Sequence, residues 1–226
     1  LCSGGDLYKR HPYSEKQAAK IVKECLSAIA YLHSHNVIHR DVKYENIMFE
    51  SDAPNAQVKL IDFGLSKSFL RKNDVMTERV GTLYTMSPQV MKGMYTAQAD
   101  LWSIGVVAFM LLSGSDPPFQ GSTPEETVSK VVKARLAFKG KIWHTRSAES
   151  KEFISSLLKV DPQLRLTAVE ALKNPWLSKE INLSDTKPYP ELVSNVAKNL
   201  VNYAACNDLK KVALNIIAKR SNTDEI

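Results

Sequence analysis

His39-Arg40-Asp41-Val42-Lys43-Tyr44-Glu45-Asn46 is the stretch that decides how the rest of this 226-residue sequence is interpreted. It places carboxylate, amide and cationic side chains within a few positions of one another. Sixteen residues after Asn46 comes a second polar triplet, Asp62-Phe63-Gly64. Short apolar runs of β type surround these polar residues, at 37–49 and 57–62. We therefore expect a small β element to carry them.

The sequence on either side of this stretch has mainly helical patterns. Ser14 and Gln17 have the spacing of a capping box at the start of a helix over 14–34. Residues 63–95 lack periodicity and predict a long loop, and long ordered loops are usually functional. The later helices are predicted at 97–113, 123–134, 147–158 and 167–173.

The composition is that of a globular protein, with 44% hydrophobic and 24% charged residues. There are 9 glycines, and neither G-x-G-x-x-G nor G-x-x-x-x-G-K-[ST] occurs. The sequence therefore contains no glycine-rich phosphate-binding loop. It begins at Leu1 rather than at Met, and we interpret it as a fragment.

The formal net charge is +6 and the pI is near 9.1. Counted over three regions, 1–92, 93–186 and 187–226, the excess of basic over acidic residues is +3, +1 and +2. This even distribution, without a basic arm, argues against a nucleic-acid partner.

Three cysteines far apart in the sequence, Cys2, Cys25 and Cys206, fit a reducing compartment better than a disulfide framework. The longest apolar run, Ile104 to Leu112, is too short to span a bilayer. We therefore expect a cytoplasmic protein without a transmembrane segment.

Residues 39–46 match H-R-D-x-x-x-x-N, and with Asp62-Phe63-Gly64 they resemble the catalytic loop and metal-binding triplet of eukaryotic protein kinases. The resemblance implies a mainly α fold, a kinase C-terminal lobe over 1–178 with a small β element, with the N-terminal lobe absent. Further matching segments are Gly81-Thr82, Asp100 to Gly105, Pro117 to Phe119, Asp161 to Arg165 and Asn174 to Trp176.

The resemblance implies a role for each polar residue, with ATP and Mg²⁺ as cofactors. Asp41 would accept the proton of the substrate hydroxyl, and Lys43 would reach the γ-phosphate, as in Ser/Thr kinases. Asn46 and Asp62 supply the hard oxygen ligands that Mg²⁺ prefers. Thr82 would hydrogen-bond Asp41 and Lys43. The alternative is that these are solvated loop residues.

Other positions suggest how substrate and nucleotide are recognised. Asp6 and Glu45 match acidic positions that face a basic residue before the acceptor in arginine-directed kinases. The alternative is that they are ordinary surface acids. Met48 matches the side chain beneath the adenine ring, and its alternative role is core packing.

Arg40 precedes Asp41, so an anionic partner from the long loop would help to order the site. Related kinases place a phosphothreonine where this chain has Glu78, whose fixed carboxylate could pair with Arg40 instead. The alternative is that Glu78 is a solvated charge. Asp100 matches the residue that holds the backbone of the catalytic loop.

Two positions depart from the kinase pattern. The segment Ser87-Pro88-Gln89 stands where the family has Ala-Pro-Glu, so Arg165 would keep a hydrogen bond but lose its ion pair. We therefore expect a compensating partner or a weakened loop. Thr85 stands where a tyrosine is common.

The C-terminal residues read as a polar linker over 179–190 and amphipathic helices over 191–226. The segment from Leu209 to Ala218 resembles the junction of calcium-dependent protein kinases, which inhibits the kinase and leads into a calmodulin-like domain. The resemblance implies calmodulin or an intramolecular EF-hand domain as a partner. A basic amphipathic helix is also typical of membrane-surface binding, and a helix packed on its own lobe is the alternative. The sequence contains no EF-hand calcium loop.

Two functions are compatible with these observations. The first is a Ser/Thr protein kinase of the calcium-dependent type, which would be inactive as this chain alone. The second is an inactive kinase remnant that acts as a binding or scaffold module. The presence of Asp41, Asn46 and Asp62 together favours the enzyme, because a remnant has no chemical need for all three.

Overall fold

The computed structural model describes residues 2–70 and 74–178. The linker expected at 179–190 and the helices expected at 191–226 lie outside these residues. The described elements, in chain order, are η1 (Leu7–Arg10), α1 (Glu15–Ser34), β1 (Val37–Ile38), η2 (Tyr44–Asn46), β2 (Ile47–Phe49), β3 (Val58–Leu60), β4 (Lys67–Ser68), η3 (Leu83–Thr85), α2 (Pro88–Lys92), α3 (Gln98–Ser113), α4 (Pro124–Lys133), η4 (Lys141–His144), α5 (Ala148–Leu157), η5 (Pro162–Leu164), α6 (Ala168–Ala171) and α7 (Pro175–Ser178).

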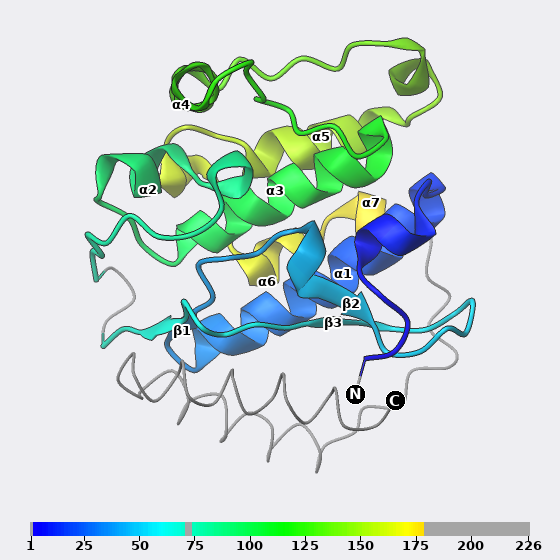
Figure 1. Ribbon diagram of the computed structural model, residues 1–226, viewed down its shortest axis with the longest axis horizontal. Coiled ribbons are helices and arrows are strands. Elements are labelled where there is room, and N and C mark those ends of the chain that lie inside the picture. Colours follow the sequence, from blue (N-terminus) through cyan, green and yellow to red (C-terminus); the bar gives the residue numbers. More distant parts are fainter. Residues whose placement is uncertain (1, 71–73, 179–226) are drawn as a thin grey trace.

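Helices α1 and α3 form the centre of the molecule and pack against each other (Figure 1). The predicted capping box begins α1, since the Ser14 hydroxyl accepts from the Gln17 amide and the Gln17 side chain accepts from the Ser14 amide. Helix α3 is buried on all sides from Ala99 to Leu112. A helix that is apolar all round belongs in a core rather than on a surface. All the helices predicted between 14 and 173 are confirmed, within a few residues at their ends.

Gly105 lets α3 approach α5 closely. A Cβ atom at this position would lie 2.9 Å from Leu157 Cβ and 2.9 Å from Leu158 Cδ2. These are core atoms, so a larger residue would push the two helices apart. The close contact of α3 and α5 forms part of the packed core that supports the polar loops.

Within the described residues, the β structure consists of two small antiparallel sheets that carry the polar stretch, as predicted. Strand β2 pairs with β3, with Ile47 opposite Leu60, and β1 pairs with β4. Beyond the end of the β2–β3 pair, the Ile61 amide donates to the Asn46 carbonyl at 2.9 Å. This bond brings Asn46 beside the residue that precedes Asp62.

The prediction of a continuous loop over 63–95 is only partly correct, because the structure has β4, η3 and α2 within it. Helix α2 begins with Ser87 as its N-cap and Pro88 in its first turn, and it ends at Gly93, which has φ = 70°. A helix of five residues is too short to produce a visible hydrophobic period.

Arg165 is buried, with 3% of its surface exposed, and it lacks the ion pair of the family pattern, as expected. Its guanidinium instead donates to three carbonyl oxygens, those of Lys159 at 2.7 Å, Gln98 at 3.0 Å and Val160 at 3.1 Å, and to the Gln89 side chain. Burial lowers the pKa of Arg165 to about 10, so it stays charged at neutral pH. These carbonyl oxygens compensate for the missing carboxylate, as one of the two sequence-based expectations for Arg165 proposed.

We predict that Gln89→Glu stabilises the fold. A carboxylate in contact with the buried guanidinium gains a charge-assisted hydrogen bond and loses the weaker bond that the Gln89 amide donates to the Val160 carbonyl, so we expect a net gain of about 1 kcal/mol in the free energy of unfolding. Urea denaturation measures the change.

The matched control is Gln98→Glu. The Gln98 side-chain amide donates to the carbonyls of Pro162 and Arg165, so a carboxylate there should destabilise the fold. Equal effects of the two substitutions, in sign and size, would contradict this account of Arg165.

None of the helices within residues 2–70 and 74–178 has the length and apolar character that a membrane crossing requires.

Candidate active site

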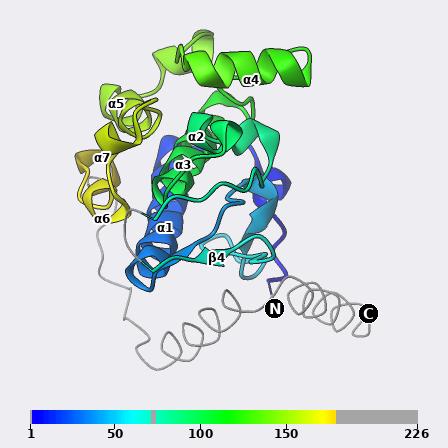
Figure 2. The ribbon, with the colours of Figure 1, turned by 90° about the vertical axis from the view of Figure 1, so that its left-hand side faces the viewer.

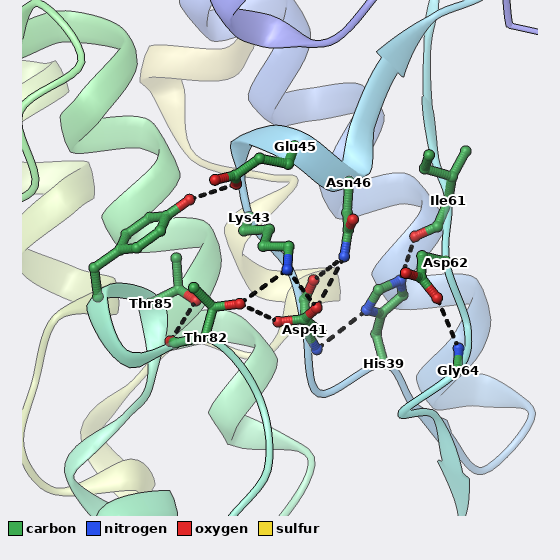
Figure 3. A network of polar contacts seen from close by, with 11 residues as sticks. His39, Asp41, Lys43, Glu45, Asn46, Ile61, Asp62, Gly64, Thr82 and Thr85 are labelled. Atoms are coloured by element: carbon green, nitrogen blue, oxygen red, sulfur yellow. Dashed lines mark hydrogen bonds and ion pairs between the residues drawn. The ribbon is translucent and has the colours of Figure 1, made fainter. Parts of the chain in front are cut away.

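Asp41 lies at the centre of a polar network and is 7% exposed (Figure 3). Its Oδ1 accepts a hydrogen bond from Thr82 Oγ1 at 2.7 Å. Its Oδ2 accepts from Asn46 Nδ2 at 3.1 Å and forms an ion pair with Lys43 Nζ at 2.9 Å. Lys43 Nζ also donates to Thr82 Oγ1 at 3.0 Å. The structure therefore brings together four of the residues singled out in the sequence.

Asp100 holds the backbone on which Asp41 sits. Its buried carboxylate accepts from the amides of His39 and Arg40, each at 2.9 Å, and from His33 Nε2 at 2.9 Å. Burial alone raises the pKa of this carboxyl, but the His33 hydrogen bond and the nearby histidines outweigh it, so the pKa lies below its ordinary value. Asp100 thus anchors the backbone of residues 39 and 40 to α3.

His39 holds the backbone at Asp41 through a second set of contacts. Its Nδ1 accepts from the Asp41 amide at 3.3 Å, and its Nε2 lies 3.2 Å from the Ile61 carbonyl. Burial lowers the pKa of His39, which favours a neutral ring with one acceptor and one donor nitrogen. The ring also packs edge-on against Phe63. His39 therefore links the 39–46 stretch to the Asp62 triplet.

Gly81 is needed for Thr82 to reach Asp41. Its φ is 114°, and a Cβ atom there would lie 2.7 Å from the Arg40 carbonyl oxygen. Any side chain would clash with this backbone atom and displace the loop.

Asn46 and Asp62 fit a magnesium site. Asn46 uses its Nδ2 to donate to Asp41, which leaves Oδ1 without a hydrogen bond from the residues that the structure describes. Asp62 has φ = 61°, and its Oδ1 accepts from the Gly64 amide at 3.1 Å. No cluster of three or more His, Cys, Asp and Glu suited to a metal occurs in the described ranges. Two protein oxygens suffice for Mg²⁺ when phosphates and water complete the shell.

Arg40 contacts Glu78 as the sequence suggested, with Nη1 2.8 Å from Oε2. Arg40 also donates to the Leu65 carbonyl and to the Tyr95 hydroxyl, and Lys67 pairs with the same carboxylate. The hydrogen bond from Lys67, reinforced by the charge of Arg40, holds the pKa of Glu78 below its ordinary value. The carboxylate thus joins three segments around the site.

The proposed recognition residues lie at the edge of the network. The Asp6 carboxylate caps η1 by accepting from the amides of Tyr8 and Lys9, and Asp6 forms a β-bridge with Met48. Met48 belongs to neither cluster of buried apolar side chains, so core packing does not account for it. Glu45 is exposed and accepts from the Tyr84 hydroxyl at 2.6 Å.

Sequence reasoning missed four side-chain partners among the described residues of this site: His33, Lys67, Tyr84 and Tyr95. His33 is in α1, 67 positions before Asp100, and no pattern predicts that contact. Lys67 shares β4 with a serine and carries no periodic signal. Tyr84 stands two residues after Thr82, and this closeness in sequence was the only indication that Tyr84 lies near the site.

Comparison with known proteins agrees with this geometry. The family described as "Protein kinase domain" matches residues 1–177. The chain belongs to the protein kinase family. The family accounts for the mainly helical fold and for the network around Asp41.

The curated relatives of this kinase chain include calcium-dependent protein kinases. Calcium-dependent protein kinase 3 of Plasmodium berghei is 38% identical over 226 positions, which cover 98% of this chain and 40% of that protein. Calcium-dependent protein kinase 25 of Arabidopsis thaliana is 39% identical over 230 positions, covering all of this chain and 43% of that protein. Calcium-dependent protein kinase 22 of rice is 36% identical. The chain spans about two fifths of the length of these relatives.

Proposed function

We propose that the protein containing this chain is a Ser/Thr protein kinase that transfers the γ-phosphate of ATP to protein substrates. The observation that carries the proposal is the double contact of Asp41 with Thr82 and Lys43. This arrangement places a carboxylate base, a cation and a hydroxyl around one point, where a substrate hydroxyl and a phosphate can meet.

Each residue then has a defined chemical task. Asp41 orients the substrate hydroxyl and accepts its proton. Lys43 stabilises the negative charge of the transferred phosphate. Thr82 positions the side chains of Asp41 and Lys43 by hydrogen-bonding to both. Asn46 and Asp62 would hold Mg²⁺ by their free oxygens, and Met48 would lie under the adenine ring. Bound ATP and Mg²⁺ supply the phosphate and neutralise its charge.

The names of the relatives support calcium control of this kinase. We propose that residues 191–226 form an inhibitory junction that responds to calmodulin or to an EF-hand domain. We also propose that Asp6 and Glu45 favour substrates with a basic residue before the acceptor, because carboxylates match the planar fork of arginine.

Phosphorylation by the full-length protein tests the proposed function. Peptides that differ only in serine, threonine or tyrosine at the acceptor are incubated with ATP and Mg²⁺, with and without Ca²⁺. We expect phosphate on serine and threonine and none on tyrosine, and no transfer when a chelator removes Mg²⁺. A protein that binds ATP but phosphorylates none of these peptides would be a binding module instead.

Replacing Glu78 with Ala should lower kcat in the full-length enzyme. Arg40 and Lys67 then lose the carboxylate that joins the loop to the site. We expect a fall of about two- to thirtyfold, equivalent to a coupling of about 0.5–2 kcal/mol. Steady-state kinetics at saturating ATP and peptide measure it.

The matched control is Glu50→Ala, which removes an exposed carboxylate paired with Lys59 at 3.8 Å. This control should leave kcat unchanged. A Glu78→Ala enzyme with the wild-type rate would show that Glu78 is a solvated charge.

A further inference from the structure

Residues 127–146, which we call the basic segment, have a local excess of positive charge. It contains six Lys and Arg residues and no Asp or Glu. Removing it from the totals of 30 basic and 24 acidic residues leaves 24 of each. The rest of the chain is therefore neutral in sum, and the count over three large regions conceals the local excess of six positive charges in this segment.

The charges of the basic segment are open to solvent. Lys133, Arg135, Lys139 and Lys141 are exposed. None of the four makes an ion pair with a residue in the described ranges. Lys130 differs, because its Nζ lies 2.9 Å from Glu126. Four neighbouring unpaired cations create a positive field that attracts an anionic partner.

The basic segment begins beside the candidate active site. It includes most of α4, which packs against α2 and η3. Helix η3 directly follows Thr82, the residue that contacts Asp41, and it carries Tyr84. Figures 1 and 2 show α4 at the edge of the molecule, next to α2. A polypeptide bound at Asp41 can therefore continue onto α4.

Charges of opposite sign flank the candidate site. Asp6 and Glu45 lie on the side of β2 and η2, while the basic segment starts in α4, which packs against η3 and α2, and continues to η4, which packs against α3. Such an arrangement orients a substrate that has a basic stretch on one side of its acceptor and an acidic stretch on the other.

We propose that the basic segment binds an acidic stretch of the protein substrate, on the far side of the acceptor from the basic residues. This proposal rests on the proposed kinase function. Val128 and Val132, 36% and 37% exposed on α4, supply apolar contact beside the cations. We favour an extended peptide over an anionic membrane, because α4 packs against η3, which directly follows Thr82, so a peptide held at Asp41 reaches the basic segment.

Paired peptides test the proposal with the full-length protein. Both have arginine before a serine, and a run of glutamates follows the serine in one and a run of glutamines in the other. We expect kcat/KM about tenfold higher for the glutamate peptide, with the difference shrinking as salt is added. The variant Lys133→Glu/Arg135→Glu/Lys139→Glu should lose the preference and still phosphorylate the glutamine peptide.

The matched control is Lys16→Glu/Lys159→Glu/Lys173→Glu, which makes the same charge change at exposed positions outside the basic segment. It should keep the preference. Equal kcat/KM for the two peptides with the unmodified protein would overturn the proposal and leave the kinase function standing.

A direct binding measurement tests the acidic-stretch proposal separately from the kinase function. Fluorescence anisotropy of the labelled glutamate peptide should show about tenfold weaker binding to the basic-segment variant than to the control variant. Vesicles containing phosphatidylserine and a DNA duplex are compared in the same assay. Binding of either that depends on the basic segment, without binding of the peptide, would overturn the proposal. If neither peptide is phosphorylated, the proposed kinase function fails and the substrate proposal fails with it, whereas equal kcat/KM for the two peptides overturns only the substrate proposal.

Discussion

Asp41→Asn should reduce kcat of the full-length enzyme by about 10²- to 10⁴-fold, the usual contribution of a positioned general base. Asparagine keeps the shape of the side chain, so its oxygen still accepts from Thr82, while its NH₂ group replaces the oxygen that faces Asn46 and Lys43. It removes the negative charge that pairs with Lys43 and the basicity that accepts the substrate proton. The KM for ATP should change little, because the nucleotide contacts proposed for Asn46 and Asp62 remain.

Two controls accompany this prediction. Asp52→Asn makes the same chemical change at an exposed residue that pairs with Lys9, and it should have no effect on kcat. Circular dichroism should give the same melting temperature for Asp41→Asn and the wild type within a few degrees. An Asp41→Asn enzyme with more than about a tenth of the wild-type kcat would remove Asp41 from the role of base.

Asp100→Ala should cost about 3–5 kcal/mol in the free energy of unfolding. The substitution leaves the buried amides of His39 and Arg40 without an acceptor and removes the partner of His33. Each unsatisfied buried amide costs about 1–3 kcal/mol. Urea denaturation measures the loss, and kcat should fall as well because the backbone beside Asp41 is no longer held.

Asp100→Asn sharpens the test of this anchor. It keeps one acceptor oxygen and turns an NH₂ group toward the second amide, so we expect a smaller loss than with alanine. Asp52→Ala, at an exposed position, should cost less than about 0.5 kcal/mol. An Asp100→Ala protein as stable as Asp52→Ala would contradict the anchoring role.

Much of this fold could be predicted from the sequence because its signals are local. The capping box at Ser14 and Gln17 and the apolar spacing that follows fix the start and the inner face of α1. The Asp41 network could be predicted only through its resemblance to kinases, because Asp41, Asp62 and Thr82 come from separate segments. Contacts between segments are not visible in periodicity.

The sequence did not reveal features that depend on tertiary packing. The carbonyls that satisfy Arg165 are backbone atoms, which any residue provides, so no side-chain pattern identifies them. The contact of His33 with Asp100 depends on how α1 crosses α3. The basic segment was hidden because charge was counted over regions much longer than one surface element.

The most direct test of the central claim is phosphate transfer from labelled ATP to a serine peptide by the full-length protein. We predict phosphoserine on the peptide, detected by mass spectrometry, with Mg²⁺ required and with almost none formed by Asp41→Asn. A folded protein that binds ATP and Mg²⁺ but forms no phosphoserine or phosphothreonine, with or without Ca²⁺, would contradict the account.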